Sequence, residues 1–129
     1  MTIVVLESPY NAPTPEGIAR NKKYAAAAMR DCFLNHHEIP LVSHLSFTKA
    51  LNDKVDAERT LGINAGLELG RICAEKTVVY IDLGTSRGMT FGIEHAKANG
   101  RPIEYRDLGP DWEKKFDEQR GNVKFEADN

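Results

Sequence analysis

Short apolar runs alternate with longer segments of helical periodicity along most of this chain, and this alternation is the feature that most constrains its fold. A strand buried on both faces is a continuous apolar run, so each short run predicts a strand of a parallel sheet, and each longer segment predicts a crossover helix. The sequence therefore predicts a single-domain α/β fold of three layers, Rossmann-like or flavodoxin-like, with a mostly parallel sheet of four or five strands. The expected strands are Ile3–Leu6, Leu41–Leu45, Thr77–Ile81 and Pro102–Tyr105, and the expected helices are Pro15–Leu34, Asp56–Ile72, Ser86–Asn99 and Asp111–Arg120.

The length of 129 residues suits one domain. We expect residues 1–110 to form the α/β unit that carries the ligand site, and residues 111–129 to add a C-terminal helix and a polar tail to the same domain. Lys and Arg number 17 and Asp and Glu number 19, which gives a formal net charge of -2. The chain thus lacks the basic excess of a protein that binds a nucleic-acid polymer.

The chain has two cysteines, Cys32 and Cys73, and no Cys-x-x-Cys spacing, so neither a disulfide framework nor a metal site is expected. We expect both thiols to be small core residues in a reducing compartment. No apolar run approaches the roughly 18 residues that span a bilayer, and no secretory leader follows Met1. These features predict a cytoplasmic protein without a membrane partner, in a bacterial cell or a phage-infected host.

One expected helix, 56–72, has glycine at every fourth position. Leu61, Ala65, Leu69 and Ile72 form its apolar stripe, and Gly62, Gly66 and Gly70 recur along one side. Because each glycine costs a helix roughly 1 kcal/mol relative to alanine, we expect the glycines to allow close backbone approach to a sheet, another helix or a ligand.

In a parallel α/β sheet the loops that follow the strands meet at one edge, and ligands bind there. The segment after the third expected strand has the features of an anion-binding loop. Gly84 and Gly88 leave backbone N–H groups accessible, Ser86 precedes a helix with its positive dipole end, and Arg87 adds a guanidinium. The alternative is that Gly84 only makes the turn, Ser86 only caps the helix and Arg87 is solvated. Neither a Walker A loop nor a GxGxxG fingerprint is present.

Three arginines lie near the starts of expected helices: Arg20, Arg59 and Arg87. A cation opposes the helix dipole at that end, so the placement is unfavourable unless an anion binds nearby. A guanidinium fork suits phosphate, which favours a phosphorylated ligand. The alternative for each arginine is an ion pair with an acid such as Glu16 or Glu58.

The first two loops offer further ligand contacts. Tyr10 can stack on a base or sugar, Ser8 can donate to a hydroxyl, and Glu7 can orient a ribose or act as a base. His44 can hydrogen-bond a ligand from the end of the second expected strand. The alternatives are a proline turn with an aromatic lid for the first loop, and a satisfied structural histidine for His44.

Two more carboxylates join Glu7 as catalytic candidates. Asp82 ends the third expected strand, and Glu94 lies about two turns into the helix that follows. A buried carboxylate on that helix could attack an anomeric carbon. A salt bridge or solvation is the alternative for Glu94, because it falls between the apolar and exposed positions of the helix.

Several short motifs together resemble the nucleoside 2-deoxyribosyltransferase-like superfamily. They are Ser8-Pro9-Tyr10, Arg20-Asn21, Asp82-Leu83-Gly84-Thr85 and Gly100-Arg101-Pro102. The resemblance covers Ile3 to about Leu108, and within the superfamily it is nearest to small phage and bacterial proteins with a Gly-x-Ser-Arg-Gly-Met segment, here Gly84–Met89. It implies ligand contacts for Asn21 and Met89 beside the loop residues above.

The resemblance implies a flavodoxin-like sheet, self-association that completes the pocket, and a ligand with a base and a ribose. In the transferases a glutamate shortly after Asp-x-Gly-Thr is the nucleophile, and its aligned place here falls near Gly92. Glu94 lies two residues further on, about 200° around the helix, which makes it a poor substitute. The departure leaves the binding of such a ligand intact and removes the expected nucleophile.

These observations predict a protein that binds a phosphorylated nucleoside derivative: a nucleotide, an ADP-ribose-like molecule or a cyclic nucleotide. As an enzyme it would cleave or transfer an N-glycosidic bond, with a carboxylate from Glu7, Asp82 or Glu94. As a binding protein it would sequester a nucleotide immune signal without turnover, as a phage anti-defence protein. A structural subunit without a ligand is the third possibility. We expect no cofactor, no metal and a homo-oligomer, with a nucleotide-derived small molecule as partner.

Overall fold

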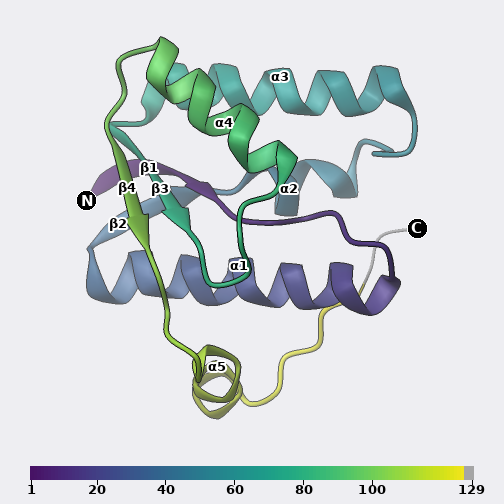
Figure 1. Ribbon diagram of the computed structural model, residues 1–129, viewed down its shortest axis with the longest axis vertical. Coiled ribbons are helices and arrows are strands. Elements are labelled where there is room, and N and C mark those ends of the chain that lie inside the picture. Colours follow the sequence, from purple (N-terminus) through teal and green to yellow (C-terminus); the bar gives the residue numbers. More distant parts are fainter. Residues whose placement is uncertain (127–129) are drawn as a thin grey trace.

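The computed structural model describes residues 1–126, and within them a parallel sheet of four strands lies between two layers of helices (Figure 1). The predicted three-layer α/β fold is confirmed. The strands are β1 (Thr2–Glu7), β2 (Glu38–Leu41), β3 (Lys76–Tyr80) and β4 (Ile103–Arg106). The helices are α1 (Pro15–Asn35), α2 (Ser43–Ser46), α3 (Asp56–Cys73), α4 (Arg87–Ala98) and α5 (Trp112–Arg120), and the 3₁₀ turn Phe47–Lys49 follows α2.

The strands follow the order β2-β1-β3-β4, with every neighbouring pair parallel. β1 and β3 are the central strands, and Glu7 at the end of β1 is in register with Val79 of β3. From β1 the chain continues to one side for β2 and to the other side for β3. The carboxyl ends of β1 and β3 therefore flank the topological switch point, where open α/β sheets bind their ligands.

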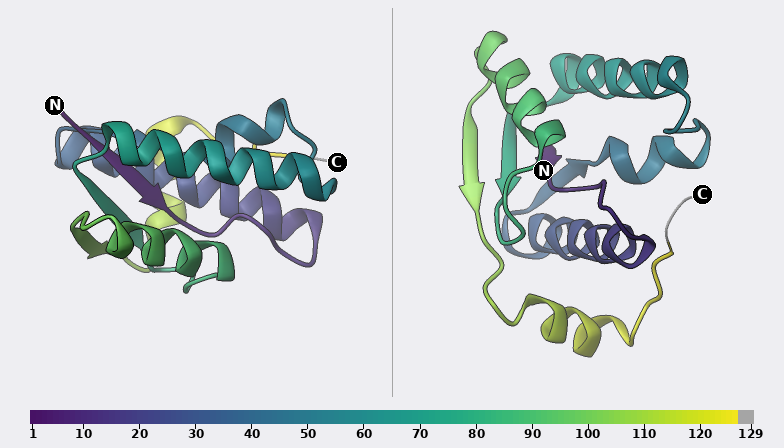
Figure 2. Two further views of the ribbon diagram at one scale, coloured as in Figure 1. Left: turned by 90° about the horizontal axis from the view of Figure 1, so that it is seen from above. Right: turned by 45° about the vertical axis from the view of Figure 1, so that its right-hand side comes forward.

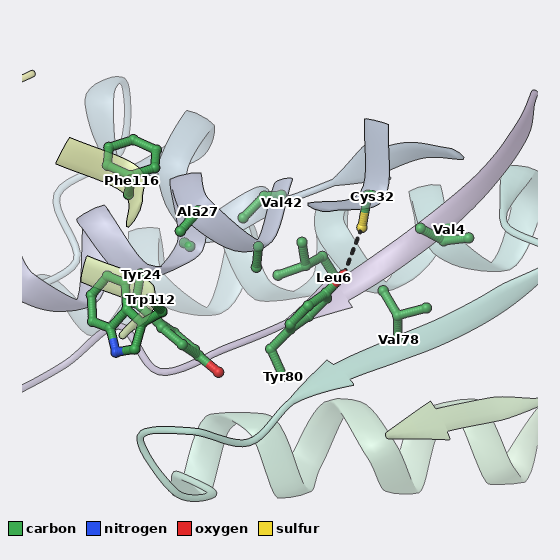
Figure 3. Packing of buried hydrophobic residues seen from close by; sticks show 12 residues of the cluster. Val4, Leu6, Tyr24, Ala27, Cys32, Val42, Val78, Tyr80, Trp112 and Phe116 are labelled. Atoms are coloured by element: carbon green, nitrogen blue, oxygen red, sulfur yellow. Dashed lines mark hydrogen bonds between the residues drawn. The ribbon is translucent and has the colours of Figure 1, made fainter. Parts of the chain in front are cut away.

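The larger hydrophobic core lies between the sheet and α1 (Figure 3). α5 packs on the outer side of α1 and adds Trp112 and Phe116 to this core. The Tyr80 hydroxyl lies 3.4 Å from Cys32 Sγ, which gives the buried phenol a polar contact. The fully buried members from the strands and α1 are Val4, Leu6, Val78, Tyr80, Tyr24, Ala25, Ala28 and Cys32. Each large side chain of this kind contributes about 1.5–3 kcal/mol by its burial.

α3 and α4 cover the opposite face of the sheet (Figures 1 and 2). There Val79 packs against Met89 and Ile93 of α4 in a smaller cluster. Because side chains alternate along a strand, Val5 and Glu7 of β1 point to this same face. The α3/α4 face is therefore less completely filled by apolar side chains than the α1 face.

The position of the second strand differs from the prediction. The sequence predicts it at Leu41–Leu45, whereas β2 is Glu38–Leu41 and the next residues begin a short helix at Ser43. Pro40 lies inside β2, in register with Val4, and this is possible because β2 is an edge strand that pairs with β1 alone. The start of β2 does not look like a buried strand in the sequence, because Glu38 is an acid. Its burial is possible because its carboxylate forms an ion pair with Arg106 at 2.8 Å.

The glycines of α3 lie on the side of the helix that faces β1 and α2. A Cβ on Gly70 would lie 2.7 Å from Val5 Cγ2, and one on Gly66 would lie 2.8 Å from Ser43 Oγ, so the backbone of α3 approaches β1 and α2 closely. The apolar stripe consequently faces outward, and Leu61 and Ile72 are 60% and 65% exposed. The prediction that Cys73 is a core residue is wrong for the same reason: it lies exposed at the end of α3, whereas Cys32 is buried.

No helix among residues 1–126 combines the length and the apolar character that crossing a bilayer requires.

Candidate functional site

A cavity of about 490 Å³ lies on the α3/α4 face of the sheet and reaches the carboxyl ends of the strands. Its walls come from the end of β1, the segment 40–53, α3, the first turns of α4, and Arg101 before β4. Small-molecule sites commonly occupy about 300–1,000 Å³, so this cavity has the size of a ligand site. We call it the α3/α4 cleft.

α4 brings its N-terminus to the cleft. Ser86 is the N-cap residue, and its Oγ accepts a hydrogen bond from the Met89 N–H at 3.2 Å. Arg87 and Gly88 form the first helical turn, where backbone N–H groups have no partner within the helix. A Cβ on Gly88 would have only Ser86 Oγ within 4.0 Å, so the space above this turn is open. The geometry suits an anion, as the sequence predicts for this loop.

Glu7 projects from β1 toward α4. An ideal Cβ on Gly92 would lie 2.2 Å from Glu7 Oε2 and 2.9 Å from Oε1, so the carboxyl group occupies the space that a side chain at position 92 would need. Burial raises the pKa of Glu7 to about 8, against the opposing effect of the Arg101 charge. At neutral pH this carboxyl group is therefore mostly protonated, and it can donate a hydrogen bond or a proton.

Ser8, His44 and Tyr10 form a polar cluster in the cleft lining. Ser8 Oγ and His44 Nε2 are hydrogen-bonded at 3.0 Å, and the Tyr10 ring meets the imidazole edge-on with centroids 6.1 Å apart. Burial lowers the pKa of His44 to about 4, so the imidazole is neutral at pH 7. A serine next to a histidine resembles a nucleophile with its base, but so weak a base would activate the hydroxyl poorly. The pair is suited to hydrogen bonding with a ligand.

The rest of the lining combines charge and apolar surface. Arg59 lines the cleft from the start of α3, and the acids Asp53 and Glu58 line it nearby. Glu58 is already engaged, because its Oε1 accepts from the Asn52 N–H at 3.0 Å. The apolar part of the wall comes from α3 and the segment before it, namely Phe47, Leu51, Ile63 and Leu67.

The structure does not bring Arg20 into the cleft. Its side chain is 53% exposed, lies 3.9 Å from Glu113 and stacks over the Trp112 ring at 5.6 Å. Asn21 does not line the cleft but supports residues that do. Its Nδ2 donates to the Tyr10 carbonyl at 2.9 Å and to the Asn11 carbonyl at 3.2 Å. Asn21 thus holds the loop that presents Tyr10.

Asp82 also lies apart from the cleft lining. Its oxygens accept hydrogen bonds from the Tyr24 hydroxyl at 2.5 Å, the Leu108 N–H at 2.8 Å and the Gly109 N–H at 2.9 Å. A carboxylate with three donors is the anchor of the loop that follows β4.

Glu94 and Gly84 do not line the cleft. The Glu94 side chain is 66% exposed and lies 3.8 Å from Lys97 on the outer side of α4. Gly84 adopts φ +83° in the turn after β3, a conformation that glycine tolerates without strain. Of the three catalytic candidates, the cleft thus contains Glu7 alone among the residues that the structure describes.

Two residues of the site, Arg101 and Gly92, appear in motifs of the sequence but were given no role in ligand binding. Arg101 lines the cleft, is 9% exposed and donates from Nε to Thr77 Oγ1 at 2.9 Å. Gly92 provides the space for Glu7. The signal for Arg101 was the Gly100-Arg101-Pro102 motif, and the signal for Gly92 was a glycine inside a helix that also packs on the sheet.

Fold and cleft define a parallel α/β protein with a ligand-sized cavity at the switch point of its sheet. The chain belongs to the family described as domain of unknown function DUF7768, whose model matches residues 2–106. The match runs from β1 to the end of β4 and includes all of the cleft lining described above. Neither a curated protein nor a solved structure matches the chain. In residues 1–126, no group of three or more His, Cys, Asp or Glu side chains is arranged to hold a metal ion.

Proposed function

We propose that the protein binds a phosphorylated nucleoside derivative in the α3/α4 cleft. One observation carries the proposal: a single cavity combines the open N-terminus of α4 and Arg87 with Tyr10, His44 and the protonated carboxyl group of Glu7. The first pair of features suits a phosphate, and the second group suits a base and a ribose.

The phosphate is assigned to the first turn of α4. The Arg87 and Gly88 N–H groups point along the positive end of the helix dipole, and the guanidinium of Arg87 can hold two phosphate oxygens. Arg59 adds a second positive charge from α3. Because Arg59 has Asp53 and Glu58 for neighbours in the lining, Arg87 is expected to contribute more to affinity.

The nucleoside is assigned to the rest of the cleft lining. Tyr10 offers an aromatic face or edge, and the wall formed by Phe47 and Ile63 offers apolar surface. Glu7 in its protonated form can donate to a ring nitrogen or a ribose oxygen. Ser8 and His44 supply hydrogen bonds from the cleft lining.

Cleavage of the N-glycosidic bond is the second candidate function, and the contact between Glu7 and Gly92 favours it. The resemblance to the deoxyribosyltransferase-like proteins aligns a nucleophile near position 92, and here the carboxyl group of Glu7 occupies that space. A carboxyl group protonated at neutral pH fits the role of general acid: it gives its proton to the departing base as the N-glycosidic bond breaks, while a water molecule attacks the anomeric carbon and forms the new C–O bond. Sequestration of a nucleotide signal, by contrast, requires the binding groups alone.

Thermal unfolding with a panel of nucleosides, nucleotides, NAD, ADP-ribose isomers and cyclic nucleotides tests the proposal, followed by chromatography of the recovered ligand. A bound ligand raises the free energy of unfolding by RT ln(1 + [L]/Kd), and Tm rises with it. Arg87→Gln should weaken binding by at least about tenfold and reduce the shift, whereas Arg71→Gln, at an arginine paired with Glu68 outside the cleft, should keep it. Intact ligand supports sequestration, and free base supports cleavage. No shift with any phosphorylated nucleoside would reject the proposal.

We also propose that the chain self-associates through the outer side of α3. Leu61 and Ile72 are 60% and 65% exposed there, and Phe91 on α4 is 57% exposed. Large exposed apolar side chains on neighbouring helices are a common sign of an interface. Light scattering during size-exclusion chromatography should give a mass above 14.4 kDa, and Leu61→Glu should return the monomer. A monomeric wild-type protein at high concentration would contradict this assignment.

A further inference from the structure

Arg101 lies at the inner end of the cleft, under α3. It is 9% exposed, and its Nε donates to Thr77 Oγ1 at 2.9 Å. A Cβ on Gly70 would lie 3.6 Å from Arg101 Nη2 and 3.7 Å from Nη1, so the glycine of α3 allows the guanidinium to lie close against the helix backbone. This contact fixes the plane of the guanidinium group between α3 and the sheet.

The two terminal nitrogens of Arg101 have no hydrogen-bond partner in the described part of the chain. The hydrogen bond from Nε to Thr77 is the only one that the Arg101 side chain makes there, while the backbone N–H donates to the Ala96 carbonyl at 2.9 Å. No fully buried side-chain nitrogen or oxygen in the same residues lacks a partner. The unbonded Nη1 and Nη2 atoms must therefore reach open space, and the residue lines the cleft.

Within residues 1–126, the charge of Arg101 has no carboxylate partner within 4.0 Å, in contrast to the charge of Arg106, which is also buried. Arg106 donates to both oxygens of Glu38 at 2.8 Å, which is a bidentate pair. Glu7 is the acid that acts electrostatically on Arg101, yet no ion pair within 4.0 Å joins them, and burial keeps the Glu7 carboxyl group protonated. A buried cation without a counter-charge is costly, and a bound anion would relieve that cost.

We propose that Arg101 is an anion-binding residue and that the ligand of the cleft carries a second anionic group, a phosphate or a carboxylate, which reaches the Arg101 fork. This assignment of a second anionic group rests on the proposed function, in which the first phosphate binds at the N-terminus of α4. Thr77, which anchors Arg101, precedes Val79 by two residues in β3, and Val79 is level with Glu7. The position that anchors Arg101 is therefore two residues, or about 7 Å of strand, from the level of Glu7.

Arginine side-chain NMR of the ¹⁵N-labelled wild-type protein, titrated with inorganic phosphate, tests the assignment, and Arg101→Gln identifies the Arg101 signals. We expect phosphate to shift the signals of both Arg101 and Arg87. In calorimetry the wild-type protein should bind two phosphates, and Arg101→Gln and Arg87→Gln should bind one each. Acetate in place of phosphate distinguishes a carboxylate site from a phosphate site. The proposal is overturned if the Arg101 signals stay unmoved by both anions.

Nucleotide titrations separate this inference from the proposed function. Adenosine 3′,5′-bisphosphate should bind the wild-type protein more tightly than adenosine 5′-monophosphate, by about tenfold for one added charged contact. Arg101→Gln should lose this difference, whereas Arg101→Lys, which keeps the charge and the fold, should retain part of it. Phosphate binding at Arg101 without any nucleotide binding would support Arg101 and reject the proposed function. Nucleotide binding with an unchanged preference in both variants would reject Arg101 and leave the proposed function standing.

Discussion

The carboxyl group of Glu7 occupies the space beside Gly92 that any side chain at that position would fill. The ideal Cβ of an alanine there would lie 2.2 Å from Glu7 Oε2. Glu7 comes from the end of β1 and Gly92 from the second turn of α4, so the contact joins two elements at the switch point of the sheet. The carboxyl group that fills the space beside this helix is thus supplied by a strand.

Gly92→Ala should displace the Glu7 side chain with a limited cost in stability. The clashing atoms belong to the end of a flexible side chain, which can rotate away, and the alanine itself favours the helix by about 1 kcal/mol. We therefore expect a change in Tm of a few degrees at most and a loss of at least about tenfold in nucleotide affinity or turnover. Thermal unfolding and calorimetry on the same samples measure both effects.

Lys97→Ala is the matched control, because it places an alanine in the same helix outside the cleft lining. The Lys97 side chain is 60% exposed and lies 3.8 Å from Glu94. The substitution should leave Glu7 and the ligand affinity unchanged. Equal ligand affinity in Gly92→Ala and the wild-type protein would show that Glu7 has no part in the site.

The Glu7 carboxyl group should make the free energy of unfolding depend on pH. Burial raises its pKa from 4.5 to about 8, so between these values the folded state binds more protons than the unfolded state. The free energy of unfolding contributed by Glu7 therefore falls as pH rises through this range and is level above it. Glu7→Gln, which imitates the protonated acid, should remove that fall.

The titration of His44 limits the pH range in which the effect of Glu7 on the free energy of unfolding can be measured. Burial lowers the pKa of His44 from 6.5 to about 4, so between these values the unfolded state binds more protons, and His44 makes stability rise with pH. Urea denaturation between about pH 7 and 8 thus measures Glu7 above the range of His44 and below that of the buried Cys32 thiol, whose ordinary pKa of 9.0 burial raises to about 11. The same slope in Glu7→Gln and in the wild-type protein would mean that Glu7 is ionised at neutral pH.

The imidazole of His44 should stay neutral throughout the physiological range. With a pKa of about 4, its proton resonances should be constant from about pH 5.5 to 8, and His44→Gln assigns them by their loss. NMR titration is the measurement. A midpoint near the ordinary value of 6.5 would show that the ring is solvated, and it would reopen a role for His44 as the base of Ser8.

The layers of this fold could be predicted from local patterns, because a buried strand and an amphipathic helix each show their periodicity within a short window. β2 shows the limit. Glu38 is buried because Arg106, 68 residues further on, neutralises it, and no local pattern contains that pair. The orientation of α3 could not be predicted locally either, since Gly70 and Gly66 pack closely against Val5 and Ser43 on other elements.

The candidate site was predictable in part for the same reason. Ser86 and Arg87 follow a strand and begin a helix, so their place at the switch point is a local property that the structure bears out. Arg20 also begins a helix, but Trp112 and Glu113 of α5 bind it, and these lie about ninety positions away in the chain. Whether an arginine faces a ligand or a protein acid depends on such distant partners.

Asp82 supplies the last test, because a catalytic and a structural role predict opposite results. Its carboxylate accepts from the Leu108 and Gly109 N–H groups and from the Tyr24 hydroxyl. Asp82→Ala should leave these donors unsatisfied and lower the free energy of unfolding by about 1–3 kcal/mol, with nucleotide affinity little changed at temperatures where the variant is folded. Asp107→Ala, at an exposed acid of the same loop, should leave stability nearly unchanged. A stable Asp82→Ala protein that has lost turnover would instead make Asp82 the catalytic carboxylate.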